Sequence, residues 1–417
     1  MMKETEMKRV PKLRFPEFTD DWEQRKLLSC IQKITDFRGR TPKKLGMDWS
    51  ESGYLALSAL NVKDGYIDFS QDVHYGDQVL YDKWMSGNEL HKGQVLFTTE
   101  APMGNVAQVP DNKRYILSQR TIAFDVKADI ITENFLAIVL RSSTVFNTLT
   151  SLSSGGTAKG VSQKSLAGVD VQIPSDLREQ TLLAEYFRHL DYLITLHQRK
   201  LEKLKKLRKG MMQKLFSQEI RFKADDGSGF PEWEEKKVGS LGDIVGGGTP
   251  STKKKEYWCG KIAWVSSADI GDNDIRNINI TRFITREAIA DSATKIIPKD
   301  SILIVSRVGV GKVAKASCNL CTSQDFTNIV NLDGDVTFLS YAVLRLMQSK
   351  LQCVQGTSIK GIPNDEIKNY TLNIPCLAEQ QKIANCLSSL DGVIEKQKAT
   401  LAAWEEMKKG LLQQMFV

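Results

Sequence analysis

The sequence contains no run of about eighteen apolar residues, the length that a membrane-spanning helix needs, and its first residues, Met1 to Val10, are rich in charge. A secretory signal would also need an apolar stretch there. We therefore expect a soluble protein of the cytoplasm. Hydrophobic residues still make up 41% of the 417 residues, which suffices for packed cores and excludes a wholly disordered chain. A chain of this length is expected to form two or more domains.

Histidine and cysteine are both scarce. Because every histidine lies in the first half of the chain, a histidine-based catalytic site repeated in both halves is excluded; the residues are His74, His91, His189 and His197. The seven cysteines are odd in number and scattered, which predicts reduced thiols rather than a disulfide framework. Cys318 and Cys321 are closely spaced, but a structural zinc site needs two further ligands of suitable spacing, so we expect no metal.

The motifs of nucleotide and methyl-donor enzymes are also missing. Gly309-x-Gly311-Lys312 resembles part of a phosphate-binding loop, but Val313 stands where that loop needs serine or threonine. No Asn-Pro-Pro-Tyr-like tetrapeptide is present for methylating a flipped base, and no glycine fingerprint after a strand indicates a bound methyl donor. The chain is expected to be non-catalytic and to bind no cofactor itself. Its net charge of +7 is a mild bias toward polyanions, which alone does not identify a ligand.

What the sequence does contain is a repeat. The segment from Leu177 to Phe216 aligns without a gap on the segment from Leu377 to Phe416, a shift of 200. Identical pairs include Leu177/Leu377, Glu179/Glu379, Gln180/Gln380, Ala184/Ala384, Leu190/Leu390, Asp191/Asp391, Ile194/Ile394, Leu201/Leu401, Lys209/Lys409, Gly210/Gly410, Gln213/Gln413 and Phe216/Phe416.

Weaker echoes precede each of these segments. They are Trp22-Glu23 with Trp233-Glu234, Thr41-Pro42 with Thr249-Pro250, Gly104 to Ala107 with Gly311 to Ala314, Ser118-Gln119 with Ser323-Gln324, Gly156-Thr157 with Gly356-Thr357, and Ile173-Pro174 with Ile374-Pro375. A duplicated scaffold with diverged bodies is expected if each body does the same job on a different target. Neutral drift of the two surfaces is the alternative.

The bodies show short apolar runs separated by Gly, Asp, Asn and Pro, a pattern typical of strands. Strands are predicted at Tyr54 to Ala59, Gln94 to Thr98, Arg114 to Leu117, Thr121 to Val126, Ile262 to Val265 and Ser301 to Val305. The spacing of apolar residues predicts helices at Glu133 to Leu149 and Phe338 to Leu351. We expect two mixed α/β bodies.

A long helix is predicted after each body, since no proline occurs between Pro174 and Pro231. Asp176 with Glu179 fits a capping box at the first helix start. Steps of four and three residues then define a heptad seam. In the first copy the seam is Leu190, Ile194, His197, Leu201, Leu204, Arg208, Met211 and Leu215; in the second it is Leu390, Ile394, Gln397, Leu401, Trp404, Lys408, Leu411 and Met415. A rival seam uses Leu207 in place of Arg208.

The fold class expected is α/β, with two mixed domains joined by two long antiparallel helices that form a coiled-coil spacer and a pseudo-twofold repeat. An antiparallel pairing about the seam midpoint sets Leu201 against Trp404, Leu204 against Leu401, His197 against Lys408, and Arg208 against Gln397. Forty helical residues span roughly 60 Å. The expected domains are residues 1–175, the helix 176–218, residues 219–375, and the helix 376–417.

Basic and small residues recur in matching loops of the two bodies, and such loops either contact DNA or are ordinary solvated turns. The candidate DNA-binding residues of the first body are Arg38, Arg40, Thr41, Lys43, Lys44, Gln119, Arg120 and Lys159. Those of the second body are Thr249, Lys253, Lys254, Lys255, Arg307, Lys312, Gln324 and Lys360. The basic run from Arg199 to Lys209 is either a solvated helix face or, with Leu193, Leu196, Leu207 and Met212 beside the seam, a surface that docks a partner.

The order of these motifs resembles the specificity subunit of type I restriction-modification systems. The resemblance is carried by Leu13 to Phe18 with Trp22, their echo Phe230 to Lys236, the Thr-Pro loops, Gly356-Thr357, and Ile-Pro followed by Glu-Gln, and it covers nearly the whole chain.

This resemblance implies two target recognition domains that each read half of a split DNA sequence, with the helices acting as a ruler. It also implies two methyltransferase subunits that hold S-adenosylmethionine and, through them, restriction subunits that use ATP and Mg²⁺. The C-terminal helix is expected to complete the first domain. A two-headed protein-interaction adaptor that does not bind DNA is the alternative.

Overall fold

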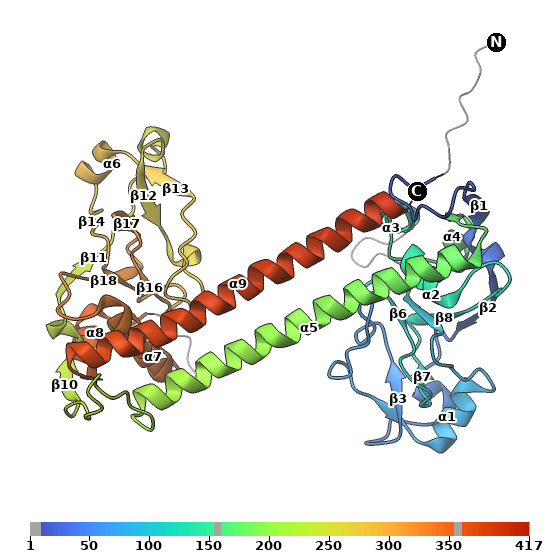
Figure 1. Cartoon of the computed structure of the whole chain (residues 1–417), viewed down its shortest axis with the longest axis horizontal. Helices are drawn as coiled ribbons and strands as arrows, with labels where there is room; N and C mark the ends of the chain where they lie inside the picture. The colour runs from blue at the N-terminus through green and yellow to red at the C-terminus, as the bar shows by residue number, and fades with distance from the viewer. Residues whose placement is uncertain (1–9, 154–159, 354–360, 417) are drawn as a thin grey trace, which may run out of the picture. The chain divides into compact units, whose positions relative to one another are not determined.

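The computed structural model describes residues 10–153, 160–353 and 361–416. Its contacts divide the chain into two units, Met1–Lys200 with Gln397–Val417, and Leu201–Lys396. Each unit therefore combines one strand-rich body with part of each long helix, α5 (Leu177–Phe216) and α9 (Leu377–Met415). Both long helices carry labels in Figure 1.

The body of the first unit alternates short strands with short helices. Its strands are β1 (Glu23–Lys26), β2 (Ile31–Asp36), β3 (Tyr54–Leu57), β4 (Tyr75–Gly76), β5 (Val95–Thr98), β6 (Val106–Gln108), β7 (Ile116–Leu117), β8 (Thr121–Val126) and β9 (Asp170–Ile173). Its helices are η1 (Leu27–Cys30), η2 (Pro42–Leu45), α1 (Gln78–Met85), α2 (Glu133–Val139), α3 (Ser143–Leu152) and α4 (Gln163–Ala167). Within the described residues these strands form sheets of order β2-β8-β5-β6, β4-β3-β7 and β1-β9.

The body of the second unit follows the same plan. Its strands are β10 (Glu234–Lys237), β11 (Asp243–Gly246), β12 (Ile262–Val265), β13 (Arg282–Ile284), β14 (Ile296–Ile297), β15 (Ile302–Val305), β16 (Val313–Lys315), β17 (Leu320–Thr322), β18 (Phe326–Val330) and β19 (Thr371–Ile374). Its helices are η3 (Val238–Ser240), η4 (Lys255–Trp258), η5 (Ser267–Asp269), α6 (Arg286–Ala290), α7 (Val336–Cys353) and α8 (Asn364–Asn369).

The sheets of the second body are β11-β18-β15-β16, β13-β12-β17-β14 and β10-β19 in the described part of the chain. In both bodies one strand pair is parallel, β3 with β7 and β12 with β17, and the other ladders are antiparallel. The repeat predicted from sequence is therefore also a repeat of topology.

The predicted strands Thr121–Val126 and Ile262–Val265 have the bounds seen in the structure, whereas the helix predicted at Glu133 to Leu149 is two helices, α2 and α3. Ser142 ends the run because its hydroxyl accepts from the backbone of Val145 at 3.4 Å, which caps α3. In the described part of the chain no single helix is long and apolar enough to span a membrane, although α2 and α3 pass that test as a bent pair.

One glycine position recurs for a backbone reason. Gly104 and Gly311 lie in matching turns with φ of +89° and +93°, and each donates to the strand before it, to Thr98 O at 2.9 Å and to Val305 O at 3.0 Å. A Cβ on Gly311 would lie 2.2 Å from Leu351 Cδ1. Both the conformation and the neighbour therefore favour glycine.

Replacing Gly311 with alanine is expected to destabilise the second unit by about 1–3 kcal/mol, because alanine would be forced into the left-handed region against Leu351. Gly246, which has open space around its Cα and no positive φ, is the matched control and should tolerate alanine. Urea unfolding of the full chain measures both variants, and equal effects at the two positions would contradict this explanation.

The heptad seam predicted from sequence is the buried side of both long helices. No member of either seam list is exposed, whereas Leu207, the basis of the rival seam, is 52% exposed. In the first unit Asp191 of α5 pairs with Lys408 of α9, and Gln198 of α5 pairs with Glu405 of α9. The residue number increases along α5 while that of its partner decreases along α9, so the two segments are antiparallel there.

The predicted pairing of the polar seam residues is wrong. Lys408 pairs with Asp191 at 2.6 Å, while His197 receives the side chain of Gln397, with Gln397 Nε2 2.8 Å from His197 Nδ1. Arg208 pairs instead with Asp391. Both cations therefore pair with an aspartate of the opposite helix, because a largely buried cation is unfavourable without an anion beside it. The predicted layers of Leu201 with Trp404 and Leu204 with Leu401 join different units and stay predictions.

The start of each long helix is tied to its body by the Glu-Gln pair of the repeat. The Glu179 carboxylate accepts hydrogen bonds from Nε and Nη2 of Arg14, each at 2.7 Å, and from the indole of Trp22 at 3.2 Å. The predicted capping box is therefore wrong, because this carboxylate is engaged elsewhere; Asp176 accepts from the backbone of Arg178 instead. The hydrogen bond to Glu179 raises the pKa of Arg14.

The second unit repeats this arrangement with Glu379, which is fully buried. Arg221 donates to it at 3.2 and 2.8 Å, and the indole of Trp233 donates at 3.1 Å. The neighbouring amides also match, since Gln180 donates to Pro174 O and Gln380 to Pro375 O, both at 2.9 Å. The motif thus fixes where each long helix leaves its body.

The far end of each long helix completes the other body. Phe416, which directly follows α9, contacts the rings of Trp22, Phe135 and Phe187 in the first unit. Phe216 of α5 contacts the rings of Trp233 and Phe338 in the second. The core of the first unit therefore includes Met415 and Phe416 from the far end of the chain, and the expectation that the C-terminal helix completes the first domain is confirmed.

Candidate nucleic-acid interface

Three loops of the first body converge through backbone hydrogen bonds. Thr99, after β5, donates to Arg120 O at 2.9 Å and accepts from Val161 N at 2.9 Å. The turn before β8 is fixed in addition by Ser118 N, which donates to Leu57 O at 3.0 Å. The hairpin end, the Ser-Gln turn and the segment after residue 159 therefore meet in one place.

The second body has the same convergence. Ser306 donates to Asp325 O at 2.8 Å and accepts from Ile362 N at 2.7 Å, while Ser323 N donates to Val265 O at 2.9 Å. The residues match those of the first body through the repeat. Because the ladders hold the loops by backbone groups, the side chains of these loops are free to differ between the bodies.

The Thr-Pro loop joins this region in both bodies. In the first body Thr41, Lys43 and Gln119 line a cavity of about 240 Å³ that also contains Trp49 and Trp84. In the second body the hydroxyl of Thr249 donates to the amide oxygen of Gln324. The structure thus brings together two motifs that lie about 75 residues apart in sequence.

The glycines before Thr249 serve the protein's own packing. A Cβ on Gly247 would lie 2.0 Å from Ser323 O, and one on Gly248 would lie 2.5 Å from the backbone of Ala293. Neighbouring backbone therefore occupies the space beside these two glycines. Gly246 has open space instead.

Many of the predicted basic residues have internal partners. Arg38 pairs with Asp36 at 2.5 Å; burial alone would raise the pKa of Asp36, but hydrogen bonds and charge from Arg38 lower it. The other engaged residues are Arg40, which donates to Trp84 O and lies over Phe37; Lys44, bonded to Gly39 O; Arg120, paired with Glu100; Lys254, bonded to Tyr257; and Lys312, paired with Asp272.

Four predicted basic residues are exposed and have no carboxylate partner among the described residues: Lys43, Lys253, Lys255 and Arg307. Lys43 belongs to the cavity of the first body, and Arg307 lies beside Gly361 at the loop convergence of the second. Unpaired cations on converging loops suit phosphate contact. Lys159, Lys360, and the Gly156-Thr157 and Gly356-Thr357 loops lie outside the described residues.

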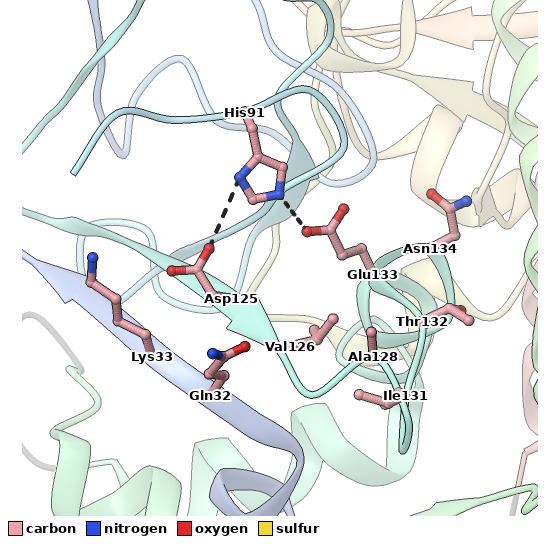
Figure 2. Close-up of a pocket in the computed structure, with 10 residues that line it drawn as sticks. All are labelled: Gln32, Lys33, His91, Asp125, Val126, Ala128, Ile131, Thr132, Glu133 and Asn134. Atoms are coloured by element: carbon pink, nitrogen blue, oxygen red, sulfur yellow. Dashed lines mark hydrogen bonds and ion pairs between the residues drawn. The ribbon is translucent and has the colours of Figure 1, made fainter. Parts of the chain in front are cut away.

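A second hollow of the first body, of about 570 Å³, is lined by a histidine that lies close to two carboxylates (Figure 2). His91 Nε2 lies 2.6 Å from Glu133 Oε1, and its Nδ1 lies 4.0 Å from Asp125. Figure 2 shows the ring between the two carboxylates, with Lys33 and Gln32 on the neighbouring strand. The contact ties the segment before β5 to the start of α2.

In the described ranges no group of three or more histidine, cysteine, aspartate or glutamate side chains is placed to hold a metal ion. Cys321 lies in β17 and packs in the core with Trp264 and Ile284, and burial raises the pKa of its thiol to about 11. Its spacing from Cys318 is therefore explained by a core position.

Sequence reasoning missed several residues that organise both units. Asp191 and Asp391 appeared only as an identical pair of the repeat, and Arg14 and Arg221 were not singled out. The signal was available, because Asp191/Asp391 and Arg208/Lys408 are each separated by 200 residues. An acidic pair and a basic pair with the same spacing, on two helices expected to pack together, indicate salt bridges between those helices.

Comparison with known proteins agrees with this architecture. The family described as type I restriction modification DNA specificity domain matches residues 19–206 and 231–403. The MjaIX specificity subunit of Methanocaldococcus jannaschii is 35% identical over 207 residues, which cover 48% of each chain. A putative MjaX specificity subunit of the same organism is 24% identical over 96% of this chain and 94% of its own.

The E. coli EcoR124I/EcoR124II specificity subunit is 29% identical over 38% of this chain and 41% of its own. Among solved structures, a type I restriction-modification S subunit from M. genitalium shares the fold with a TM-score of 0.62 and 15% identity, over 98% of this chain and 99% of its own. These relatives are named as specificity subunits, a role without catalysis of its own.

Proposed function

This chain belongs to the family of the type I restriction modification DNA specificity domain, and from that membership we propose that each of its bodies reads one half of a split DNA site. The observation that carries the proposal is the loop convergence found in both bodies. The same backbone frame holds a Thr-Pro loop, a Ser-Gln turn and unpaired cations, while the side chains differ. A repeated frame with different side chains suits two readers of different sequences.

The candidate residues differ in which of their charged or hydrogen-bonding groups are available to DNA. Lys43, Lys253 and Lys255 are exposed and have no ion pair within the described part of the chain, so we assign them to phosphate contacts that position the duplex. Arg307, also unpaired, and Gln119 are the side chains best suited to base edges, because guanidinium and amide groups make bidentate contacts in the major groove. Gln324 has its amide oxygen held by Thr249, which leaves its Nε2 to donate.

The rest of the assembly belongs to partner chains in this proposal. The long helices set the gap between half-sites and dock two methyltransferase subunits, through which restriction subunits join. S-adenosylmethionine, ATP and Mg²⁺ would be held by those partners and not by this chain. The complex would act in the cytoplasm on the host's DNA and on incoming DNA.

Replacing Lys253 and Lys255 together with alanine is expected to weaken binding to all DNA sequences alike. Loss of two phosphate contacts should reduce the slope of log affinity against log salt by about two, since each contact contributes about 0.9. The measurement is fluorescence anisotropy with labelled duplex at several salt concentrations, using the complex of this chain with its methyltransferase.

The matched control is the double alanine variant of Lys236 and Lys237, which removes the same charge from β10. Its slope should equal that of the wild type. An unchanged slope for the Lys253 and Lys255 variant contradicts the assignment of these residues, and a wild-type complex whose affinity does not depend on salt favours a protein-interaction adaptor instead.

A further inference from the structure

An aspartate at the same place in each long helix joins three parts of its unit. In the first unit Asp191 of α5 receives Arg141 at 2.8 Å from the body and Lys408 at 2.6 Å from α9. In the second unit Asp391 of α9 receives Tyr341 Oη at 2.6 Å from the body and Arg208 at 2.5 Å from α5. Each carboxylate thus bonds to its body and to the opposite helix.

The repeat relates the two helix contacts but not the two body contacts. Shifting Asp191 and Lys408 by 200 in opposite directions gives Asp391 and Arg208. Arg141 follows α2, whereas Tyr341 lies within α7, and the two differ in type. Two different side chains therefore make the same connection, although the surfaces of the bodies have diverged.

The bonds of the second unit are shielded from water, and in the first unit the Asp191 side chain is 28% exposed. Tyr341 is fully buried, and the side chains of Asp391 and Arg208 are 9% and 12% exposed. In the first unit the Arg141 side chain is 7% exposed, and it also pairs with Asp64 of its own body at 2.6 Å. Turning a body on its helices would leave a buried carboxylate short of a partner, which is strongly unfavourable.

The electrostatics agree with the geometry. Burial raises the pKa of Tyr341, and its hydrogen bond to the Asp391 carboxylate raises it further. Burial alone would raise the pKa of Asp191, but the hydrogen bond and charge of Arg141, followed by the charge of Lys408, lower it. Apolar seam contacts tolerate sliding and rotation, whereas these bonds are directional.

We propose that Asp191 and Asp391 are positioning residues that fix the orientation of each recognition body on its helix pair, and through it the gap at which both half-sites are read. The part concerning the gap rests on the proposed function, while the part concerning orientation stands without DNA. The competing explanation is that these bonds add stability without fixing an orientation.

The test variant is Tyr341→Phe, which removes the hydroxyl that bonds to Asp391 and leaves Arg208 on that carboxylate. The matched control is Tyr370→Phe, which removes the same kind of bond, from Tyr370 Oη to Glu366 at 2.6 Å, at an exposed site. Both are made in the full chain and studied with the methyltransferase partner.

The first measurement needs no DNA. Spin labels on noncanonical residues at the exposed positions Glu287 of α6 and Gln381 of α9 report the distance between body and helix inside the second unit. The distance distribution should widen for Tyr341→Phe and stay as in wild type for Tyr370→Phe. An unchanged distribution for Tyr341→Phe overturns the proposal.

The second measurement is methylation of duplexes with the native gap and with gaps one base pair shorter or longer. Tyr341→Phe should raise methylation at the wrong gaps, relative to the native gap, by about tenfold, the factor expected for one hydrogen bond to a charged group, without changing the half-site letters. A widened distribution with unchanged gap preference overturns the functional part.

The two failures are distinguishable. If the wild-type complex methylates no split site at all, the proposed function fails while the distance measurement still decides the orientation. In the first unit the exchange Asp191→Lys with Lys408→Asp restores the bridge between helices but places a cation beside Arg141. This double variant should be more stable than either single variant, while its preference for the native gap should stay relaxed. A preference as strict as that of the wild type would overturn the role assigned to the bond with the body.

Discussion

Replacing Glu379 with alanine is expected to destabilise the second unit by about 3–5 kcal/mol. The side chain is fully buried and satisfies Arg221 and the indole of Trp233 together, so its removal leaves a cation and a buried donor without their acceptor. The strand pair β10 with β19, which leads into α9, should lose protection first.

Hydrogen exchange of the full chain, resolved for peptides of β10 and β19, measures this loss, and urea unfolding gives the free energy. Gln381→Ala, at an exposed position two residues further along the same helix, is the control and should stay within about 0.5 kcal/mol of wild type. Glu179→Ala should have the same effect on β1 and β9. A Glu379→Ala variant as stable as the control would show that the Glu-Gln motif is not the anchor of the helix.

A heptad inserted into both long helices is expected to lengthen the gap between half-sites by about three base pairs, because seven helical residues add roughly 10 Å and one base pair rises about 3.4 Å. The insertions duplicate residues 194–200 in α5 and residues 397–403 in α9. They fall between the two aspartate junctions, so Asp191 with Lys408 and Asp391 with Arg208 keep their own partners.

Methylome sequencing of a host that carries the variant with its partner subunits reads both the gap and the letters. Insertion into α5 alone is the control and should abolish methylation, because it moves the two junctions out of register with each other. Altered half-site letters with an unchanged gap would refute the idea that the helices set the spacing.

The sequence predicted the repeated parts of this molecule well, and the reason is physical. Heptad spacing and freedom from proline are local properties, so the long helices and their buried side were predictable before any contact was known. The strands at Thr121–Val126 and Ile262–Val265 are fully apolar on at least one face, and their predicted bounds match the structure.

Predictions from local sequence patterns failed where a residue distant in the sequence determines the local structure. The run from Glu133 to Leu149 has helical spacing throughout, yet Ser142 caps a new helix within it, and Arg141, between α2 and α3, bonds to Asp64 and Asp191. Glu179 fits a capping box by its spacing, yet Arg14 and Trp22 take its carboxylate. Neither partner can be inferred from the neighbouring residues.

The candidate interface shows the same division. The recurrence of Thr-Pro and Ser-Gln motifs marked the loops, because a duplicated frame keeps the residues that hold its backbone. Which lysines and arginines are free was not predictable, because it depends on what the fold places beside each one. Arg40 donates to the Trp84 carbonyl, whereas Lys43 has no ion pair among the described residues.

The sequence by itself determined that two related bodies alternate with two long heptad helices, because an internal repeat and a heptad period can be recognised without knowing any tertiary contact. Only the tertiary structure decided the register and the polar partners, including Asp191 with Lys408 and Asp391 with Arg208. Those contacts join residues about 200 positions apart, and an ion pair forms wherever packing brings opposite charges together and excludes water.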